Sequence, residues 1–138
     1  MNEYGLALVI EDDYDAALIF AKALQVVGFQ TEEIHNGSHA LARLAETTPN
    51  MIILDLHLPE VNGMSIIQSI RSDERLADIL VIIASADPRM ADLVQQEADL
   101  VLIKPTTFSQ VRDLARRLVE IRAKKKENDL KQSSDLES

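Results

Sequence analysis

Four short apolar segments of the sequence carry polar residues at their ends that could act together in chemistry. The segments are residues 6–10, 51–56, 79–85 and 100–104, and the polar residues are Glu11, Asp12, Asp13, Asp55, Ser85 and Lys104. Carboxylates held close together repel one another and favour a hard divalent cation, for which magnesium is the usual intracellular choice. A hydroxyl and an ammonium group facing that cation would hold an anion such as phosphate. A carboxylate between the two sites could attack phosphorus and form an aspartyl phosphate.

Asp55 stands at the least expected place for a charge. It directly follows the apolar run Met51-Ile52-Ile53-Leu54, which is typical of a buried strand. Burial disfavours the ionised form of a carboxylate unless a partner compensates for the lost water. The position of Asp55 therefore predicts that other charged groups lie beside it.

The segments between these residues show how the chain could bring them together. Strands are expected at 6–10, 30–36, 51–56, 79–85 and 100–104, and helices at 14–27, 38–47, 63–72, 89–98 and 108–126. Alternating strands and helices predict βαβ units and an α/β fold with a doubly wound parallel sheet, covered by helices on both faces. Because parallel strands end at one edge of such a sheet, the polar residues should meet there.

Composition excludes several classes of function. The 138 residues carry a net charge of −9, so direct nucleic-acid binding by this chain is not expected. There is no cysteine, which excludes disulfides, thiol catalysis and Cys-ligated zinc. No apolar stretch approaches the roughly 18 residues of a membrane span, and the N-terminus lacks the basic region of a secretory signal, so we expect a cytoplasmic protein.

Some residues have simpler interpretations. Asp13 is expected to cap the helix at 14–27, and Ser38 to cap the helix at 38–47. His35, His39 and His57 show no metal-binding spacing and are interpreted as surface or loop residues. No glycine-rich phosphate loop is present, which argues against nucleotide binding.

Four motifs in their order along the chain resemble the receiver domain of two-component response regulators, of the chemotaxis-regulator-like single-domain kind. They are LVIEDD, ILDLHLPEVNG, IIASA and LIKP, and the resemblance covers residues 4–122. It implies a flavodoxin-like (βα)5 three-layer sandwich with a five-stranded parallel sheet in the order 2-1-3-4-5. Residues 1–123 would form the receiver domain, and residues 124–138 a polar tail that is either a helix extension or disordered.

The resemblance also implies roles for the acidic residues. Asp55 would be the phosphoacceptor, receiving a phosphoryl group from a phosphohistidine. Asp12 would bind Mg²⁺ (or Mn²⁺) directly and Glu11 through water, with Asp55 and the backbone carbonyl of His57 completing the ligands.

The remaining positions of the family pattern fall on the other strand ends and turns. Ser85, the backbone of Ala86, and Lys104 would bind phosphoryl oxygens. The turn-shaping residues would be Pro59 and Gly63 after the acceptor, and Pro105, where the family usually has a cis peptide bond.

Three positions bear on switching and its reversal. Val101 stands where family members usually carry Tyr or Phe, three residues before the lysine. The hypothesis is that output still uses the face made by residues 89–98, 100–104 and 108–126, which would also serve a homodimer. Asp87 and His57 occupy positions that tune dephosphorylation in the family, although Asp87 could instead cap the helix that begins at Pro88.

The leading prediction is a phosphorylatable switch and not an enzyme, with at most self-phosphorylation from small donors and autodephosphorylation. Its partners would be a histidine kinase or histidine phosphotransfer protein and a downstream protein target or missing effector domain. One alternative is a receiver fragment of a larger regulator or hybrid kinase. Another is a Mg²⁺-dependent aspartyl-phosphate phosphatase. Such enzymes need a second acid two residues after the nucleophile, and His57 at that position argues against this alternative. A receiver-like domain that no longer needs phosphate is disfavoured by the intact polar set.

Overall fold

Strands and helices alternate along the chain. The computed structural model describes residues 3–137, with side chains described as far as Ser134. The strands are β1 (Leu6–Ile10), β2 (Gln30–Ile34), β3 (Met51–Asp55), β4 (Leu80–Ser85) and β5 (Leu100–Ile103). The helices are α1 (Tyr14–Val27), α2 (Gly37–Glu46), α3 (Gly63–Ser72), α4 (Pro88–Val94) and α5 (Phe108–Glu137).

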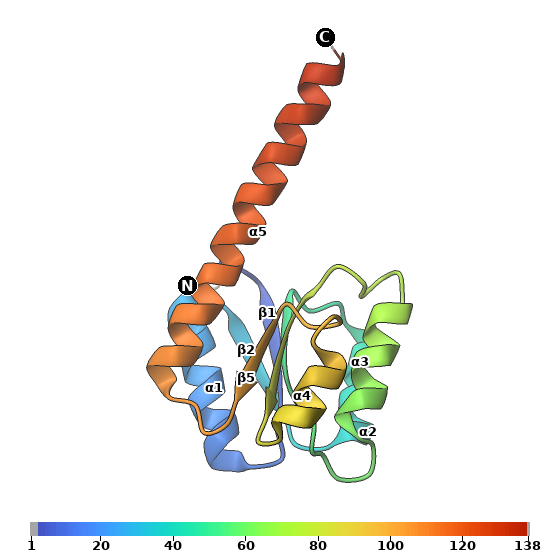
Figure 1. Cartoon of the computed structure of the whole chain (residues 1–138), viewed down its shortest axis with the longest axis vertical. Coiled ribbons are helices and arrows are strands. Elements are labelled where there is room, and N and C mark those ends of the chain that lie inside the picture. The colour runs from blue at the N-terminus through green and yellow to red at the C-terminus, as the bar shows by residue number, and fades with distance from the viewer. Residues whose placement is uncertain (1–2, 138) are drawn as a thin grey trace.

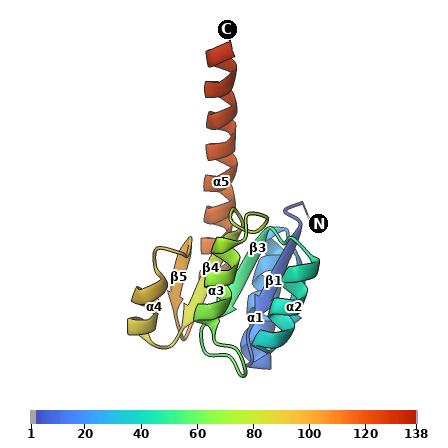
Figure 2. The ribbon, with the colours of Figure 1, turned by 90° about the vertical axis from the view of Figure 1, so that its right-hand side faces the viewer.

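The five strands form one parallel sheet in the order β2-β1-β3-β4-β5. Helices α1 and α5 cover one face, and α2, α3 and α4 cover the other (Figures 1 and 2). The doubly wound, flavodoxin-like three-layer sandwich and its strand order are thereby confirmed.

The continuous apolar runs of the sequence are explained by burial on both faces of the sheet. Ala7 and Val9 of β1 face the layer of α1 and α5, whereas Leu8 and Ile10 face the opposite layer. All five residues of β3 are buried, so this central strand is held from both sides. Burying one Val, Leu, Ile or Met side chain stabilises the fold by about 1.5–3 kcal/mol.

Strand register decides which residues meet at the carboxyl edge. β1 and β3 pair as far as Ile10 and Leu54, β3 and β4 as far as Asp55 and Ala84, and β4 and β5 as far as Ser85 and Ile103. The next residues along β1 and β5 are Glu11 and Lys104. The register therefore gathers Glu11, Asp55, Ser85 and Lys104 at one edge.

Helix α1 begins as expected, but α2 does not. The Asp13 carboxylate caps α1 by accepting hydrogen bonds from the backbone N–H groups of Asp15 and Ala16. The prediction that Ser38 caps α2 is wrong, because Asn36 is the cap and accepts from the N–H of His39. Ser38 already lies inside the helix, and its hydroxyl donates to Glu60.

Helix α5 continues well beyond residue 126 and projects from the body of the protein (Figure 1). Its side chains from Lys124 to Ser134 are all exposed. Of the two alternatives for residues 124–138, the described part has the form of a helix extension, and Ser138 lies outside the described residues. None of the described helices combines the length and apolar character needed to cross a bilayer.

Candidate functional site

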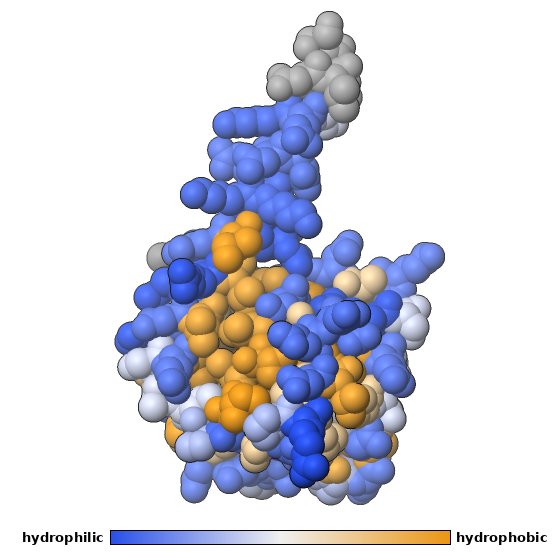
Figure 3. Space-filling model, in the orientation of Figure 1, coloured by the Kyte–Doolittle hydropathy of each residue, from blue (hydrophilic) through white to orange (hydrophobic). Residues whose placement is uncertain are grey.

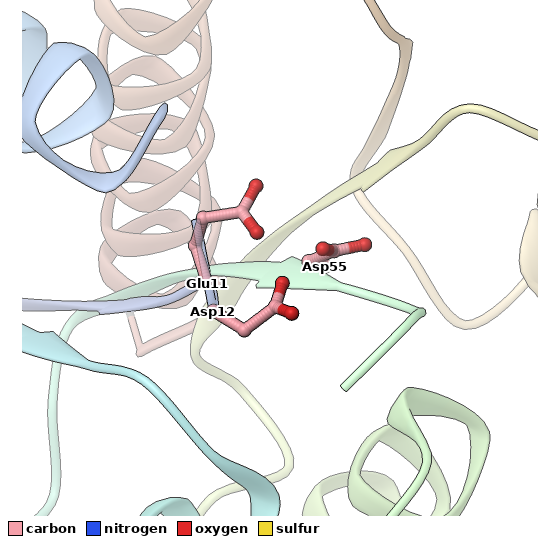
Figure 4. A group of neighbouring side chains, drawn as sticks. All are labelled: Glu11, Asp12 and Asp55. Carbon is pink, nitrogen blue, oxygen red and sulfur yellow. The ribbon is translucent and has the colours of Figure 1, made fainter. Parts of the chain in front are cut away.

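Three carboxylates converge at the carboxyl edge of the sheet. Glu11 and Asp12 follow β1 and Asp55 ends β3, and one oxygen atom from each lies within 4.8 Å of the others (Figure 4). Glu11 is fully buried and Asp55 is 4% exposed, whereas Asp12 is exposed to solvent. This arrangement of hard oxygen ligands, open on one side, fits a divalent cation such as Mg²⁺.

Lys104 supplies the positive charge of the site. Its Nζ donates to Glu11 Oε1 and lies 3.3 Å from Asp55 Oδ2. The peptide bond between Lys104 and Pro105 is cis, as the resemblance implied. The ammonium group thus lies between two buried carboxylates, which confirms the prediction that other charged groups lie beside Asp55.

The electrostatics of the site act most strongly on Glu11. Burial, reinforced by the hydrogen bond and charge of Asp55, raises the pKa of Glu11 to about 8, although Lys104 pulls it down. Burial alone would lower the pKa of Lys104, but its contacts with Glu11 and Asp55 raise it instead. Lys104 therefore stays charged at neutral pH, and Glu11 is the group that takes up a proton.

Mg²⁺ affinity should rise by about tenfold or more between pH 6 and pH 8, because protons compete with the cation for Glu11. Without metal, the proton on Glu11 also affects the free energy of unfolding. The folded pKa of about 8 exceeds the ordinary value of 4.5. The stabilising contribution of this group is therefore complete at low pH and is lost as the pH rises through about 8. Isothermal titration calorimetry across this range measures the affinity, and Glu11→Gln should flatten the pH dependence. A wild-type affinity independent of pH would contradict the assignment.

Ser85 lies fully buried at the end of β4. Its Oγ donates to the carbonyl oxygen of Asp87 (3.2 Å) and accepts from the N–H of Asp87 (3.1 Å). The Asp87 carboxylate accepts from the N–H of Arg89 and caps α4, which is the simpler of its two expected arrangements. The Ser85 hydroxyl is thus engaged with the loop that leads into α4.

A cavity of about 390 Å³ adjoins the site between α1 and the turn after β5. Ala86, Lys104 and Pro105 line it together with Ile19 and Phe20 of α1. Ala86 is exposed to solvent.

The turn after Asp55 is tightly packed. The N–H of His57 donates to Asp55 Oδ1 (3.0 Å), while the His57 side chain is exposed. The carbonyl of Pro59 accepts from the N–H of Val61, and the N–H of Gly63 donates to the Leu56 carbonyl. A Cβ atom on Gly63 would lie 2.6 Å from the Leu56 Cα and 2.8 Å from the carbonyl oxygen of Asp55. Only glycine allows α3 to start this close to Asp55.

Val101 lies on β5 opposite Ile83. It is half-buried and packs against the apolar cluster between the sheet and the α2–α4 layer. The position of the expected aromatic residue is therefore occupied by a smaller apolar side chain.

Sequence reasoning missed one neighbour of the site. His35 directly follows β2 and its Nδ1 lies 2.9 Å from the carbonyl oxygen of Glu11. Its ring stacks on that of Tyr14, with centroids 3.8 Å apart. One signal in the sequence could have indicated this residue, because His35 follows a strand that ends at the same edge as the carboxylates. The spacing of metal-binding residues could not indicate it, because His35 contacts a backbone carbonyl.

The family model for the response regulator receiver domain matches residues 7–116. The chain belongs to this family. It is thus a receiver domain of the two-component signalling systems, and the acidic edge coincides with the residues on which the sequence resemblance rested.

Individual comparisons agree with this receiver-domain assignment. The transcriptional regulatory protein PrrA of Mycobacterium leprae is 32% identical over 106 residues, covering 75% of this chain and 45% of that protein. The chain spans about half the length of the first curated relatives that it matches.

Solved structures show the same fold. The chemotaxis response regulator CheY4 of Vibrio cholerae has a TM-score of 0.75 at 19% identity, covering 82% of this chain and 97% of that one. The response regulator TrrA of Thermotoga maritima, solved in complex with Mg²⁺-BeF, has a TM-score of 0.72 at 23% identity, covering 83% and 98%. At these identities the likeness concerns the fold alone.

Proposed function

We propose that this receiver domain is a Mg²⁺-dependent phosphoacceptor switch. Asp55 accepts a phosphoryl group from the phosphohistidine of a histidine kinase or a histidine phosphotransfer protein. The observation that carries the proposal is the placement of Asp55 beside two further carboxylates and Lys104, with ligand oxygens within 4.8 Å of one another and the ammonium nitrogen 3.3 Å from Asp55 Oδ2.

The transfer needs few groups. A carboxylate oxygen of Asp55 forms a bond to phosphorus while the phosphorus–nitrogen bond of the donor breaks, and the leaving imidazole keeps the electron pair and takes up a proton. Glu11, Asp12 and Asp55 would hold the divalent cation, with the His57 carbonyl as a further ligand, and Mn²⁺ would suit the same oxygens. The bound cation would offset the repulsion between carboxylate and phosphoryl group. Lys104 offers an N–H to a phosphoryl oxygen during the transfer and keeps it once the phosphate is in place.

Switching would begin at Ser85. Its hydroxyl donates to the carbonyl of Asp87, and a phosphoryl oxygen on Asp55 offers a stronger, charged acceptor. An exchange of partners would release the loop of Ala86 and Asp87, and with it the start of α4, which Asp87 caps. Because Val101 stands where the family usually has Tyr or Phe, this change would involve no rotation of a large side chain.

The output surface is proposed to be the α4–β5–α5 face. It carries the exposed apolar side chains Leu93, Ile103 and Ile121, one from each element. Figure 3 shows a broad apolar area on the side of the molecule that carries β5. This face would bind a downstream protein or a second copy of the chain, and the projecting part of α5 could connect to an effector domain such as those of longer regulators. The proposed setting is the cytoplasm, where phosphohistidine donors are made.

Incubation with acetyl phosphate and Mg²⁺, followed by intact mass spectrometry, tests the proposal. We expect one phosphoryl group per chain, which survives the acidic conditions of the mass measurement. It should be absent when EDTA replaces Mg²⁺. An unmodified protein under these conditions would contradict the proposal. Catalytic release of phosphate from unrelated phosphomonoesters, many turnovers per chain, would favour the phosphatase alternative and would contradict the non-enzymatic role that we propose.

A further inference from the structure

The carbonyl of Glu11 is held by a side chain that has no part in the proposed transfer. His35 Nδ1 lies 2.9 Å from this oxygen. Because a carbonyl oxygen can only accept, the contact is a hydrogen bond when Nδ1 carries the ring proton. Glu11 is fully buried, so the loss of this donor would deprive a buried acceptor of its partner.

The contact extends the pairing of β1 with β2 beyond the last paired residues, Ile10 and Ile34. The N–H of Glu11 still donates to the Ile34 carbonyl (2.9 Å). The chain then turns toward α2, which Asn36 caps. The imidazole of His35 meets the Glu11 carbonyl at this turn.

Tyr14 packs against the face of the imidazole. The two rings are stacked, with centroids 3.8 Å apart and planes inclined by 23°. Tyr14 is the first residue of α1, three positions after Glu11. The His35 ring therefore contacts both ends of the segment from Glu11 to Tyr14, and the proposed metal ligand Asp12 lies between those ends.

We propose that His35, held by Tyr14, is a positioning residue for the metal-binding pair Glu11 and Asp12. This inference rests on the proposed function. The Glu11 carbonyl belongs to the peptide unit that joins the two acidic residues, so fixing that oxygen fixes the backbone from which both carboxylates project. Like charges among the clustered carboxylates would otherwise tend to drive them apart when no cation is bound. His35 and Tyr14 thus keep the site close to its ligand-binding arrangement.

The test measures Mg²⁺ affinity by calorimetry at one fixed pH, together with thermal unfolding in EDTA. His35→Ala removes both contacts and should weaken Mg²⁺ binding about tenfold, the size typical for groups that orient metal ligands. His35→Asn places an amide N–H near the position of Nδ1 and should recover most of that loss. Tyr14→Phe keeps the stacked ring and should bind like wild type, whereas Tyr14→Ala should weaken binding.

His39→Ala is the matched control, because His39 is an exposed histidine on α2 and its change should leave Mg²⁺ affinity unaltered. Wild-type affinity in His35→Ala would overturn the proposal. If His35→Ala fails to fold, wild-type affinity in Tyr14→Ala, or a tenfold loss in His35→Asn, would overturn it. A wild-type chain that binds no Mg²⁺ would instead contradict the proposed function itself, so the two failures are distinguishable.

Discussion

Asp55→Asn is expected to abolish phosphoryl uptake completely while leaving the fold intact. An amide oxygen is a far weaker nucleophile than a carboxylate, and Asp55 is the acid that lies beside both the proposed metal-binding pair and Lys104. The asparagine Oδ1 can still accept the hydrogen bond from the His57 N–H. Loss of the Asp55 charge removes one of the causes that raise the pKa of Glu11, and Glu11 keeps its contact with Lys104. The variant should therefore unfold at a temperature no lower than wild type without Mg²⁺.

The control for this variant is Asp92→Asn, a change of the same type at an exposed residue of α4. It should take up phosphate from acetyl phosphate at the wild-type rate. Uptake of a phosphoryl group by Asp55→Asn in the intact-mass assay would show that another residue is the acceptor. A cooperative unfolding transition and an unchanged circular dichroism spectrum establish that the variant is folded.

Lys104→Met is expected to slow phosphoryl uptake by roughly 100-fold, the loss typical when one group that stabilises developing charge is removed. The methionine keeps the length of the side chain but removes the ammonium group that lies against Glu11 and Asp55. Without that charge, the buried acids lose a partner, and the metal-free protein should be destabilised by roughly 2 kcal/mol.

Mg²⁺ separates this explanation from a general packing defect. The lysine competes with the cation for the same two carboxylates, so Lys104→Met should bind Mg²⁺ more tightly than wild type. Saturating Mg²⁺ should also reduce the loss of stability, because the cation replaces the missing positive charge. Lys22→Met, an exposed residue of α1, serves as control. Weaker Mg²⁺ binding by Lys104→Met, or an unchanged rate of uptake, would contradict the role given to Lys104.

The strand ends of this chain could be predicted from the sequence because two signals coincide there. A central parallel strand such as β3 needs apolar residues on both faces, so Met51 to Leu54 are unbroken, and the first charge after them marks the edge. The strand order was implied by the family resemblance, and the structure confirms it. With that order, the meeting of Glu11, Asp55, Ser85 and Lys104 follows from strand register alone.

Local alternatives of similar energy were harder to predict. Asn36 and Ser38 are both good capping residues two positions apart, and the extended backbone at Asn36 decides between them. Helix α5 carries few apolar residues after Ile121, so periodicity gave no sign that it continues to Glu137. The contact of His35 with a backbone carbonyl depends on the turn after β2, which no pattern of residue types encodes.

The most direct test of the central claim is to identify the residue that carries the phosphoryl group. The protein is treated with acetyl phosphate and Mg²⁺, reduced with borohydride, which converts an aspartyl phosphate to homoserine, and analysed by peptide mass spectrometry. We predict homoserine at position 55 alone, and only when both Mg²⁺ and the donor are present. Homoserine at another aspartate, or none after wild-type treatment, would contradict the assignment of Asp55 as the phosphoacceptor.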